Sequence, residues 1–563
     1  MINFNGGLKY WLTYIIGFAA ILAIIIVGSF YMAKPYLDNF VKREIARRSI
    51  KAETSEVSIM GKINMTNVTV PSPSGMSLKI GAVSARPPIS FIPGTFTLYN
   101  VDLKQDNIHV RIPKISINSV FLKEKDTTIK PSLLQSIMRI DLASIIAPDI
   151  LFSIENKHKL PTNLAIKDFE LSDFKNGHIR SVGIKSMDFV EASVKDGKSV
   201  RLVAKSDALK IRDIDFYYAH YMTFGGNNTI NKEKTLIGPI SLNGMVINVF
   251  EETEKNPYAS LSLGKFKMSA LKVRPPEQAP EKLARDYLNA KKANNQIAET
   301  AARNAILINS VPLMISANIQ LDKAAIDAPQ LKATFDSLQY KVSQWTQPEE
   351  QPVLKELLVF LDNFSLVPKK IEKESFNVFN NMDFNSVNFS GKIDISYDEK
   401  KRTLFLNTIS LDVKDIGSGR ISAKVVNLDK KIFSGQKDAI GAAVQDIGIT
   451  EIDMRYTDAG FIDKFFSSLA QNFNDSDHDL KKELYDHFSL MMMQSIKILL
   501  KDYEDAENIS KSFGDFAKNP QTLMIKVTAK DKKGLTVDDF VTILQNDLSA
   551  ALSKVNLTVK TAL

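Results

Sequence analysis

The amino-acid sequence predicts a mainly β protein. In the predicted fold, an N-terminal transmembrane helix precedes an elongated, bulged antiparallel β-groove or curved sheet, which carries a long mid-chain helix and a helical α+β cap at its C-terminal end. Three observations predict this fold: a charge-free apolar segment near the N-terminus, an eight-residue strand pattern that recurs along the chain, and two regions rich in helix-forming residues. The length of 563 residues allows several domains or one extended repeat architecture.

The first element is a predicted membrane anchor over residues 10–33, which follows a short segment of residues 1–9. Its 24 residues carry no charge, and at about 1.5 Å per residue such a helix exceeds the roughly 30 Å hydrocarbon core of a bilayer. Trp11, Tyr14 and Tyr31 suit the two membrane interfaces, and Ile25 lies in the apolar stretch between them. The C-terminal end of this segment, "SFYMA", is a poor signal-peptidase site, so we expect an uncleaved anchor.

Residues 34–52 are predicted to form an amphipathic basic helix. Leu37, Phe40, Val41 and Ile45 fall on one side and the basic residues on the other. Three interpretations stay open: the helix lies on an anionic lipid surface, caps the first strands, or presents a solvated charged face. Because the basic residues follow the anchor, the positive-inside rule read alone would place the bulk of the chain in the cytoplasm.

Residues 53–273 and 313–458 are predicted to form a β-meander or groove and a second β region. In "INMTNVTV", from Ile63, the apolar residues alternate, slip by one residue at Asn67 and alternate again. Five more strict copies begin at Val182, Leu209, Ala333, Met382 and Ile447, whereas chance would give about two copies in all. "FTLYNVDL", from Phe96, changes phase in the same way.

A β-bulge at the Asn would return the four apolar side chains of each copy to one face of the sheet. Two separate strands that meet at a corner would also explain the slip in phase. Ordinary amphipathic strands without a true repeat are the remaining interpretation.

Two regions depart from this strand pattern. Residues 274–312 open with the break "RPPEQAP" and continue as an Ala-rich segment, which predicts a Pro-rich linker and one long helix. Residues 459–563 contain two amphipathic helical segments and then a strand, a helix and a final strand, so we expect a separate α+β cap.

The sequence holds no recognised catalytic motif. The chain has no Cys, which excludes disulfides and thiolate metal sites, and its net charge of +8 is spread along the chain instead of forming a nucleic-acid-binding stripe. "DSDHD" fails as a calcium loop, since Leu480 stands where the turn glycine is required. We therefore expect no enzyme activity, no catalytic residues, no metal, no cofactor and no nucleic-acid partner.

The anchor, the short basic helix "YLDNFVKREIARR" and the glycine-led strands "GKINMTNVTV" and "GTFTLYNVDL" resemble the AsmA-like family of envelope proteins, relatives of the bridge-like lipid-transfer proteins. The resemblance covers roughly the first 120 residues and does not reach the C-terminal cap. It implies a single-pass inner-membrane protein of a Gram-negative bacterium with its bulk in the periplasm. It also implies a β-groove that holds the acyl chains of a phospholipid or another envelope lipid, envelope protein partners, and a role in outer-membrane lipid homeostasis or biogenesis.

Strands with one apolar face need a cover, which can be a second sheet, helices or bound lipid. The residues expected to contact lipid are the apolar positions of the repeated pattern: Ile63, Met65, Val68, Val70, Phe96, Leu98, Val101, Leu103, Val182, Ile184, Leu209, Ile211, Ile214, Phe216, Phe384, Val387 and Phe389. The alternative function is a structural or scaffold envelope protein with a closed β core and no lipid transfer.

Overall fold

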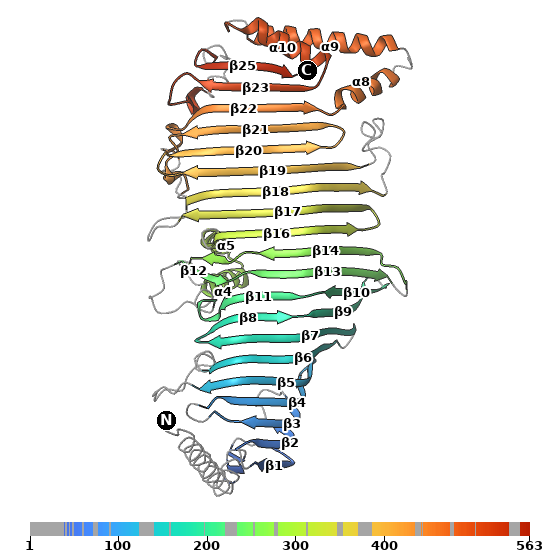
Figure 1. Ribbon diagram of the computed structural model, residues 1–563, viewed down its shortest axis with the longest axis vertical. Helices are drawn as coiled ribbons and strands as arrows, with labels where there is room; N and C mark the ends of the chain where they lie inside the picture. The colour runs from blue at the N-terminus through green and yellow to red at the C-terminus, as the bar shows by residue number, and fades with distance from the viewer. Residues whose placement is uncertain are drawn as a thin grey trace, which may run out of the picture. The chain divides into compact units, whose positions relative to one another are not determined.

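The computed structural model describes residues 39, 42–43, 46–47, 50–58, 61–70, 77–88, 92–122, 140–156, 159–195, 198–219, 233–251, 254–274, 280–310, 314–345, 353–369, 386–433, 441, 443–472, 478–500, 503–539 and 552–562. These residues are mainly β, in antiparallel strands (Figure 1). The chain divides into two compact units. Unit 1 comprises Met1–Tyr217 and Ile247–Asn256, and unit 2 comprises Tyr218–Val246 and Pro257–Leu563.

Unit 1 contains the strands β1 to β11. Their bounds are β1 (Thr54–Val57), β2 (Ile63–Val70), β3 (Ser77–Arg86), β4 (Gly94–Gln105), β5 (Ile108–Leu122), β6 (Ile140–Asn156), β7 (Lys159–Lys175), β8 (His178–Ile184), β9 (Ser186–Lys195), β10 (Lys198–Ser206) and β11 (Leu209–Asp215). From β1 to β7, each strand pairs antiparallel with the next. Strand β7 is long enough to pair with both β8 and β9, which pair onward with β11 and β10.

Unit 2 contains most of the helices and the remaining strands. The strands are β12 (Lys234–Ile237), β14 (Ala259–Met268), β15 (Leu271–Val273), β16 (Met314–Asp327), β17 (Leu331–Trp345), β18 (Val353–Pro368), β19 (Val387–Asp398), β20 (Thr403–Val413), β21 (Gly417–Val426), β22 (Gly448–Asp458), β23 (Thr522–Ala529), β24 (Leu535–Thr536) and β25 (Val555–Ala562), while β13 (Ile240–Glu251) contributes residues to both units. The helices are α4 (Pro280–Lys292), α5 (Gln296–Ser310), η2 (Lys430–Phe433), α8 (Phe461–Asn472), α9 (His478–Leu499) and α10 (Ala506–Lys518).

The sheet of unit 2 is a long antiparallel ladder. It runs from β14 through β16, β17, β18, β19, β20, β21 and β22 to β23 and β25. The last two strands belong to the region predicted as a separate cap, yet β23 pairs directly with β22. The helices α9 and α10 lie beside the final strands of this ladder (Figure 1).

The phase changes predicted from the sequence lie on transverse lines across the strands of unit 1. Asn67 in β2 and Asn100 in β4 have φ values of 46° and 51°, in the left-handed region. The ladder register places Gly81 of β3 opposite both Asn67 and Asn100, and Pro113 of β5 opposite Asn100. These four residues form no ladder pairs with one another, although the residues on either side of them do. A second such line holds Asp173, Arg180 and Asp213 of β7, β8 and β11. Facing strands therefore change phase at the same level.

Strands of unit 2 also change phase at left-handed residues that lie on a line across the sheet. Lys323 of β16 has a φ of 56° and faces Gly264 of β14. Asn363 of β18 has a φ of 47°, and its amide Nδ2 donates a hydrogen bond of 2.8 Å to Asp336 of β17. In each strand the apolar side chains on either side of the line return to one face of the sheet.

The prediction of a β-bulge at Asn100 is wrong. In a bulge two residues of one strand oppose one residue of its partner, but the pairs Ile80–Val101 and Ala82–Tyr99 show that β3 and β4 keep equal residue counts. Strands β3 and β4 change phase together, with the left-handed Asn100 facing Gly81. A bulge does occur in the copy "IGITEIDM", where Thr450 is the extra residue.

The helical predictions have mixed outcomes. The mid-chain segment forms the two helices α4 and α5 instead of one long helix, since Ala293, Asn294 and Asn295 separate them and Asn294 has a φ of 51°. Of the described residues of the predicted basic helix, Asn39, Lys42, Arg43, Ala46 and Arg47 are helical. Ile50, Lys51 and Ala52 are not, and Lys51 forms an antiparallel β-bridge with Thr69, so the predicted helix extends too far toward β1. The predicted anchor, with Trp11, Tyr14, Ile25 and Tyr31, lies outside the described residues. Within the described ranges, none of the helices has the length and apolarity required for a membrane span.

Candidate functional site

The first four strands of unit 1 bring eight of the predicted lipid-contacting residues onto one face. The register aligns Ile63, Met65, Val68 and Val70 of β2 with Ala85, Val83, Ile80 and Leu78 of β3, and these with Phe96, Leu98, Val101 and Leu103 of β4. The four apolar positions of these two copies thus share a face, as the sequence predicts. The copy that begins at Val182 is instead divided between β8 and β9, as two strands that meet at a corner would require.

One cross-strand row extends this face through unit 1. It contains Ile63, Ala85, Phe96, Ile117, Ile145, Leu171, Val182 and Ile211, each directly paired with the next. Ile184 and Leu209 form the neighbouring pair, and Ile214 pairs with Ile179. Phe216 lies just beyond the end of β11 and is exposed. The structure therefore joins predicted residues from β2, β4, β8 and β11 in one apolar surface.

Part of this surface in unit 1 is a filled core. Val68 is only 3% exposed and packs in a cluster with Ile80, Val83 and Ala85. Ile50 and Ala52, which precede β1, pack against the same cluster. The first strands of unit 1 are thus covered by the chain itself.

Unit 2 carries a second apolar surface, which is more open. Its central row consists of Ile319, Tyr340, Val359, Ile393, Ile409, Ile421, Met454, Ile525 and Val559, each paired with the next from β16 to β25. Ile393, Ile409 and Ile421 are 39%, 37% and 41% exposed although they lie in the middle of the ladder. We call this surface the unit 2 apolar face.

Two of the predicted residues lie on the unit 2 apolar face. Val387 and Phe389 of β19 pair with Leu366 and Phe364 of β18, and the rings of Phe364 and Phe389 are 4.9 Å apart. Val387 is exposed. Phe384 lies outside the described residues.

The opposite face of the same strands is polar. Lys341 of β17 pairs with Glu356 of β18 at 2.8 Å, and Lys526 of β23 pairs with Glu451 of β22 at 2.8 Å. The hydrogen bond and the negative charge of Glu451 raise the pKa of Lys526. Such exposed pairs contribute little to stability, but they place charged side chains on the face opposite to the central row.

One end of the strands in unit 2 is closed by packing. Val353, Tyr397 and Leu428 form a buried cluster there, against which Ile432 and Phe433 of η2 pack. The Tyr397 hydroxyl donates a hydrogen bond of 2.8 Å to the carbonyl oxygen of Leu428, and burial raises the pKa of Tyr397. This cluster joins β18 and β19 to η2 and to the segment that follows β21.

A hollow of about 380 Å³ lies on the apolar face between β20 and β23. Its apolar lining includes Ile409, Leu411, Ile421, Met454, Leu523 and Ile525. The volume falls in the range of roughly 300 to 1,000 Å³ that is typical of small-molecule sites. Met454 belongs to the copy "IGITEIDM", and Ile409 and Leu411 belong to a looser copy that begins at Leu404. The repeated pattern did not mark Ile421, Leu523 and Ile525, although the alternation of Ile421, Ala423 and Val425 is a visible strand signal.

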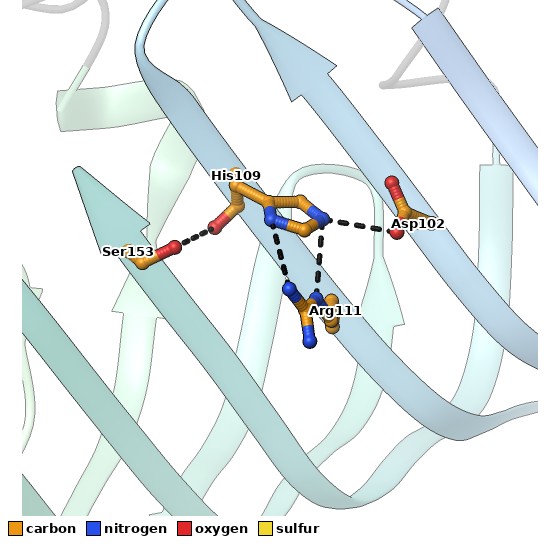
Figure 2. Close-up of polar contacts among 4 residues, drawn as sticks. All are labelled: Asp102, His109, Arg111 and Ser153. Atoms are coloured by element: carbon orange, nitrogen blue, oxygen red, sulfur yellow. Dashed lines mark hydrogen bonds and ion pairs between the residues drawn. The ribbon is translucent and has the colours of Figure 1, made fainter. Parts of the chain in front are cut away.

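A polar cluster on the other face of unit 1 resembles a hydrolase triad in composition only (Figure 2). Nε2 of His109, a residue 7% exposed, lies 2.9 Å from Oδ2 of Asp102, while Arg111 lies against the same ring. Ser153 donates its 3.5 Å hydrogen bond to the His109 carbonyl oxygen and not to the ring. The serine therefore lacks the contact with a base that would activate it as a nucleophile.

The neighbouring groups in this cluster stabilise the ionised carboxylate of Asp102. Burial acts to raise the pKa of Asp102, but the hydrogen bond with His109 and the positive charges of Lys104 and Arg111 outweigh it, so the pKa is lowered. Asp102 and Arg111 are paired in the ladder of β4 and β5. The cluster thus links two neighbouring strands on their polar face.

Among the described residues, no group of three or more His, Asp or Glu side chains is placed to hold a metal ion. What the described surfaces can do chemically is remove hydrocarbon from water, which contributes roughly 0.8 kcal/mol per buried methylene.

Comparison with protein families finds a match in the C-terminal part of the chain. Residues 410–562, which include β21, β22 and the helices of the cap, match a family described as an uncharacterized protein. The search of curated proteins gives no match to this chain.

Proposed function

We propose that this protein is a membrane-anchored envelope protein that binds or transfers lipids on apolar β surfaces, and that it has no enzymatic activity. In this proposal the acyl chains lie on the apolar faces of the two units, and the lipid headgroups face water. The proposed cargo is a phospholipid or another envelope lipid.

The observation that carries the proposal is the exposure of the central row of unit 2. Isoleucines in the middle of an antiparallel sheet are normally covered by a second layer. Here Ile393, Ile409 and Ile421 each keep more than a third of their surface exposed, and they lie on three consecutive strands in direct register. A contiguous apolar patch of this kind marks an interaction surface.

The location in the inner membrane rests on the sequence. The charge-free segment of residues 10–33 is the proposed anchor, and the resemblance of the N-terminal region to the AsmA-like family is the basis for placing the bulk of the chain in the periplasm. The basic residues after the anchor favour the opposite orientation. A phosphatase fused after Lys51 decides between them, since activity on the periplasmic side agrees with the proposal and its absence there contradicts it.

A second candidate function is supported by the packing of unit 1. The cluster around Val68 is filled by side chains of the protein itself, as a structural or scaffold envelope protein with a closed β core requires. Under this alternative the exposed face of unit 2 would bind no lipid, so the two functions differ in a measurable property.

The test is the lipid content of the full chain after extraction in a membrane-mimetic polymer. We expect phospholipid beyond the annular lipid of the anchor, and we expect Ile421→Asp to reduce it because a carboxylate on the apolar face opposes hydrocarbon binding. Ser422→Asp is the matched control, as Ser422 is the next residue of β21 and its side chain alternates to the polar face. Equal lipid content in all three proteins would favour the scaffold function.

A further inference from the structure

The C-terminal helices cover the last strands of unit 2. Ile509, Phe516 and Ala517 are buried on α10, and Ile509 belongs to a core cluster with Leu500 and Val559. The central row passes into this core: Ile421 is 41% exposed, whereas Val559 is 8% exposed. The apolar face is therefore open at β21 and closed at β25.

The free edge of β25 is also covered. The backbone N–H of Leu557 donates a 2.7 Å hydrogen bond to the hydroxyl of Tyr503, and Ser512 Oγ donates one of 3.5 Å to the carbonyl oxygen of Val559. An edge strand with unpaired groups would invite another strand. Here side chains of α10 and of the segment before it occupy two of those groups, so the sheet ends at β25.

The hollow lies directly in front of this closure. Leu523 and Ile525 line the hollow and also pack against the core under α10. Tyr456, another lining residue, contacts Phe516 of α10 edge to face, with 6.0 Å between the ring centroids. Burial, followed by the charge of Asp458, raises the pKa of Tyr456 to about 12. Phe516 does not itself line the hollow, but it packs against Tyr456, which does. We call this contact between a lining residue and α10 the blind end of the hollow.

The floor of the hollow has space because it contains a glycine. Gly419 of β21 lies between Leu411 and Tyr456 in the ladder. A Cβ added to Gly419 would have no heavy atom within 4 Å, and its backbone is not in the left-handed region. A side chain at this position would enter the hollow without straining the strand.

The chemistry of the hollow selects a hydrocarbon chain over a peptide. Strands β20 to β23 are each paired on both sides, so their backbone groups are already used in the ladder. Arg420 and Arg455, which border the hollow, alternate to the polar face, where Arg420 donates a 3.0 Å hydrogen bond to Thr408. A peptide would bring N–H and C=O groups that find no partners here, at a high cost in desolvation.

We propose that the hollow is a terminal acyl-chain site, in which the methyl end of one lipid chain stops against Tyr456 and Phe516. This inference rests on the proposed function and makes it more specific. The site is occupied by the uncharged tail of a lipid, and the C-terminal helices close the apolar face of unit 2 at β25, so lipid does not leave over that end.

The experiment uses the full chain in phosphatidylcholine vesicles that contain a small fraction of phosphatidylcholine with a diazirine at the end of one acyl chain. After irradiation, labelled peptides are identified by mass spectrometry. We expect the label on the segments around Met454–Tyr456 and Leu523–Ile525, and none on β25. Label in the N-terminal region serves as the internal standard for photolysis.

Two variants make the test specific. Gly419→Phe fills the hollow and should lower labelling of these segments at least tenfold, while Gly441→Phe, a control at a second glycine with no heavy atom near its added Cβ, should leave the labelling unchanged. Phe516→Ala opens the blind end and should extend the label to the β25 peptide. Thermal unfolding of each variant checks that the fold is retained.

The outcomes separate the two proposals. Label on other apolar strands that is unaffected by Gly419→Phe would overturn the terminal site and leave the proposed function standing. Label on β25 in the unaltered chain would overturn the closure. Label confined to the N-terminal region, with none on the apolar strands of either unit, would overturn the proposed function together with this inference.

Discussion

Asn100 of β4 lies opposite Gly81 of β3, and both strands change the phase of their apolar side chains at this pair. A Cβ on Gly81 would approach Cβ of Asn100 to 3.0 Å. The same relationship joins Lys323 and Gly264 in unit 2, again with 3.0 Å between Cβ of Lys323 and a Cβ built on the glycine. In these two pairs, the left-handed residue in one strand is accommodated by a missing side chain in the next.

The first prediction concerns the close approach at Gly81. Gly81→Ala should destabilise unit 1 by about 1–3 kcal/mol, because the added methyl group must displace Asn100 or the backbone of β4. The measurement is urea unfolding with proteolysis of unit 1 as the probe. Gly183→Ala is the matched control: its nearest contact would be 4.0 Å from a carbonyl oxygen, so we expect little change in the unfolding midpoint.

The second prediction concerns the left-handed backbone of Asn100. Asn100→Ala should lower the free energy of unfolding by about 1 kcal/mol, because the left-handed conformation is less favourable for alanine than for Asn. Asn100→Gly should be close to neutral or stabilising in the same unfolding assay, because glycine adopts a positive φ freely. A larger loss with glycine than with alanine would show that the side chain of Asn100, and not its backbone conformation, is what matters.

The third prediction concerns acid stability. Because the pKa of folded Asp102 lies below its ordinary value of 3.8, the ionised group stabilises the fold above that pH, and this contribution is lost as the pH falls through the lowered value. Asp102→Asn should therefore reduce stability at neutral pH and flatten its decline in acid. Unfolding midpoints measured across the acid range test this. Asp106→Asn, in the exposed turn after β4, is the control and should keep the decline.

The fourth prediction concerns the contact between α8 and α9. Phe466 is 6% exposed, and its ring centroid lies 4.9 Å from that of Tyr485 and 5.4 Å from that of Phe488. Phe466→Ala should cost about 3–5 kcal/mol through lost burial and the cavity left behind. Phe465→Ala, at a neighbour that is 37% exposed, should cost much less. Protection of α8 amides in hydrogen exchange measures both, and equal loss of protection would contradict the packing.

Sequence reasoning located the phase changes but not all of their physical basis. The slips at Asn67, Asn100 and Asp213 coincide with left-handed residues, since Asn and Asp tolerate that conformation and the apolar pattern records it. The matching change in the facing strand at Gly81 depends on the register between strands, which no local pattern contains. The expectation of a bulge at Asn100 was therefore wrong in mechanism while right about the shared face.

The candidate site was predictable only in part. Ile63, Phe96, Val182 and Ile211 lie in one row because their strands pair in the register that aligns the copies. The repeated pattern marked Ile409, Leu411 and Met454 of the hollow in unit 2, but it did not predict the hollow itself. The hollow depends on Gly419, and Tyr456 of its lining contacts Phe516 of α10, which lies beyond α8 and α9 in the chain.

The sequence by itself determined which side chains of the β2, β4 and β11 copies share a face, because alternation in a strand has a period of two residues and the changes of phase at Asn67, Asn100 and Asp213 fall on residue types that tolerate a left-handed backbone. Only the tertiary structure decided which parts of that face are covered. Ile50 and Ala52, which precede β1, pack against the cluster of Val68, and α10 packs against Val559, while Ile421 remains exposed. Burial depends on contacts between segments far apart in the chain, and the pattern of a single strand does not encode them.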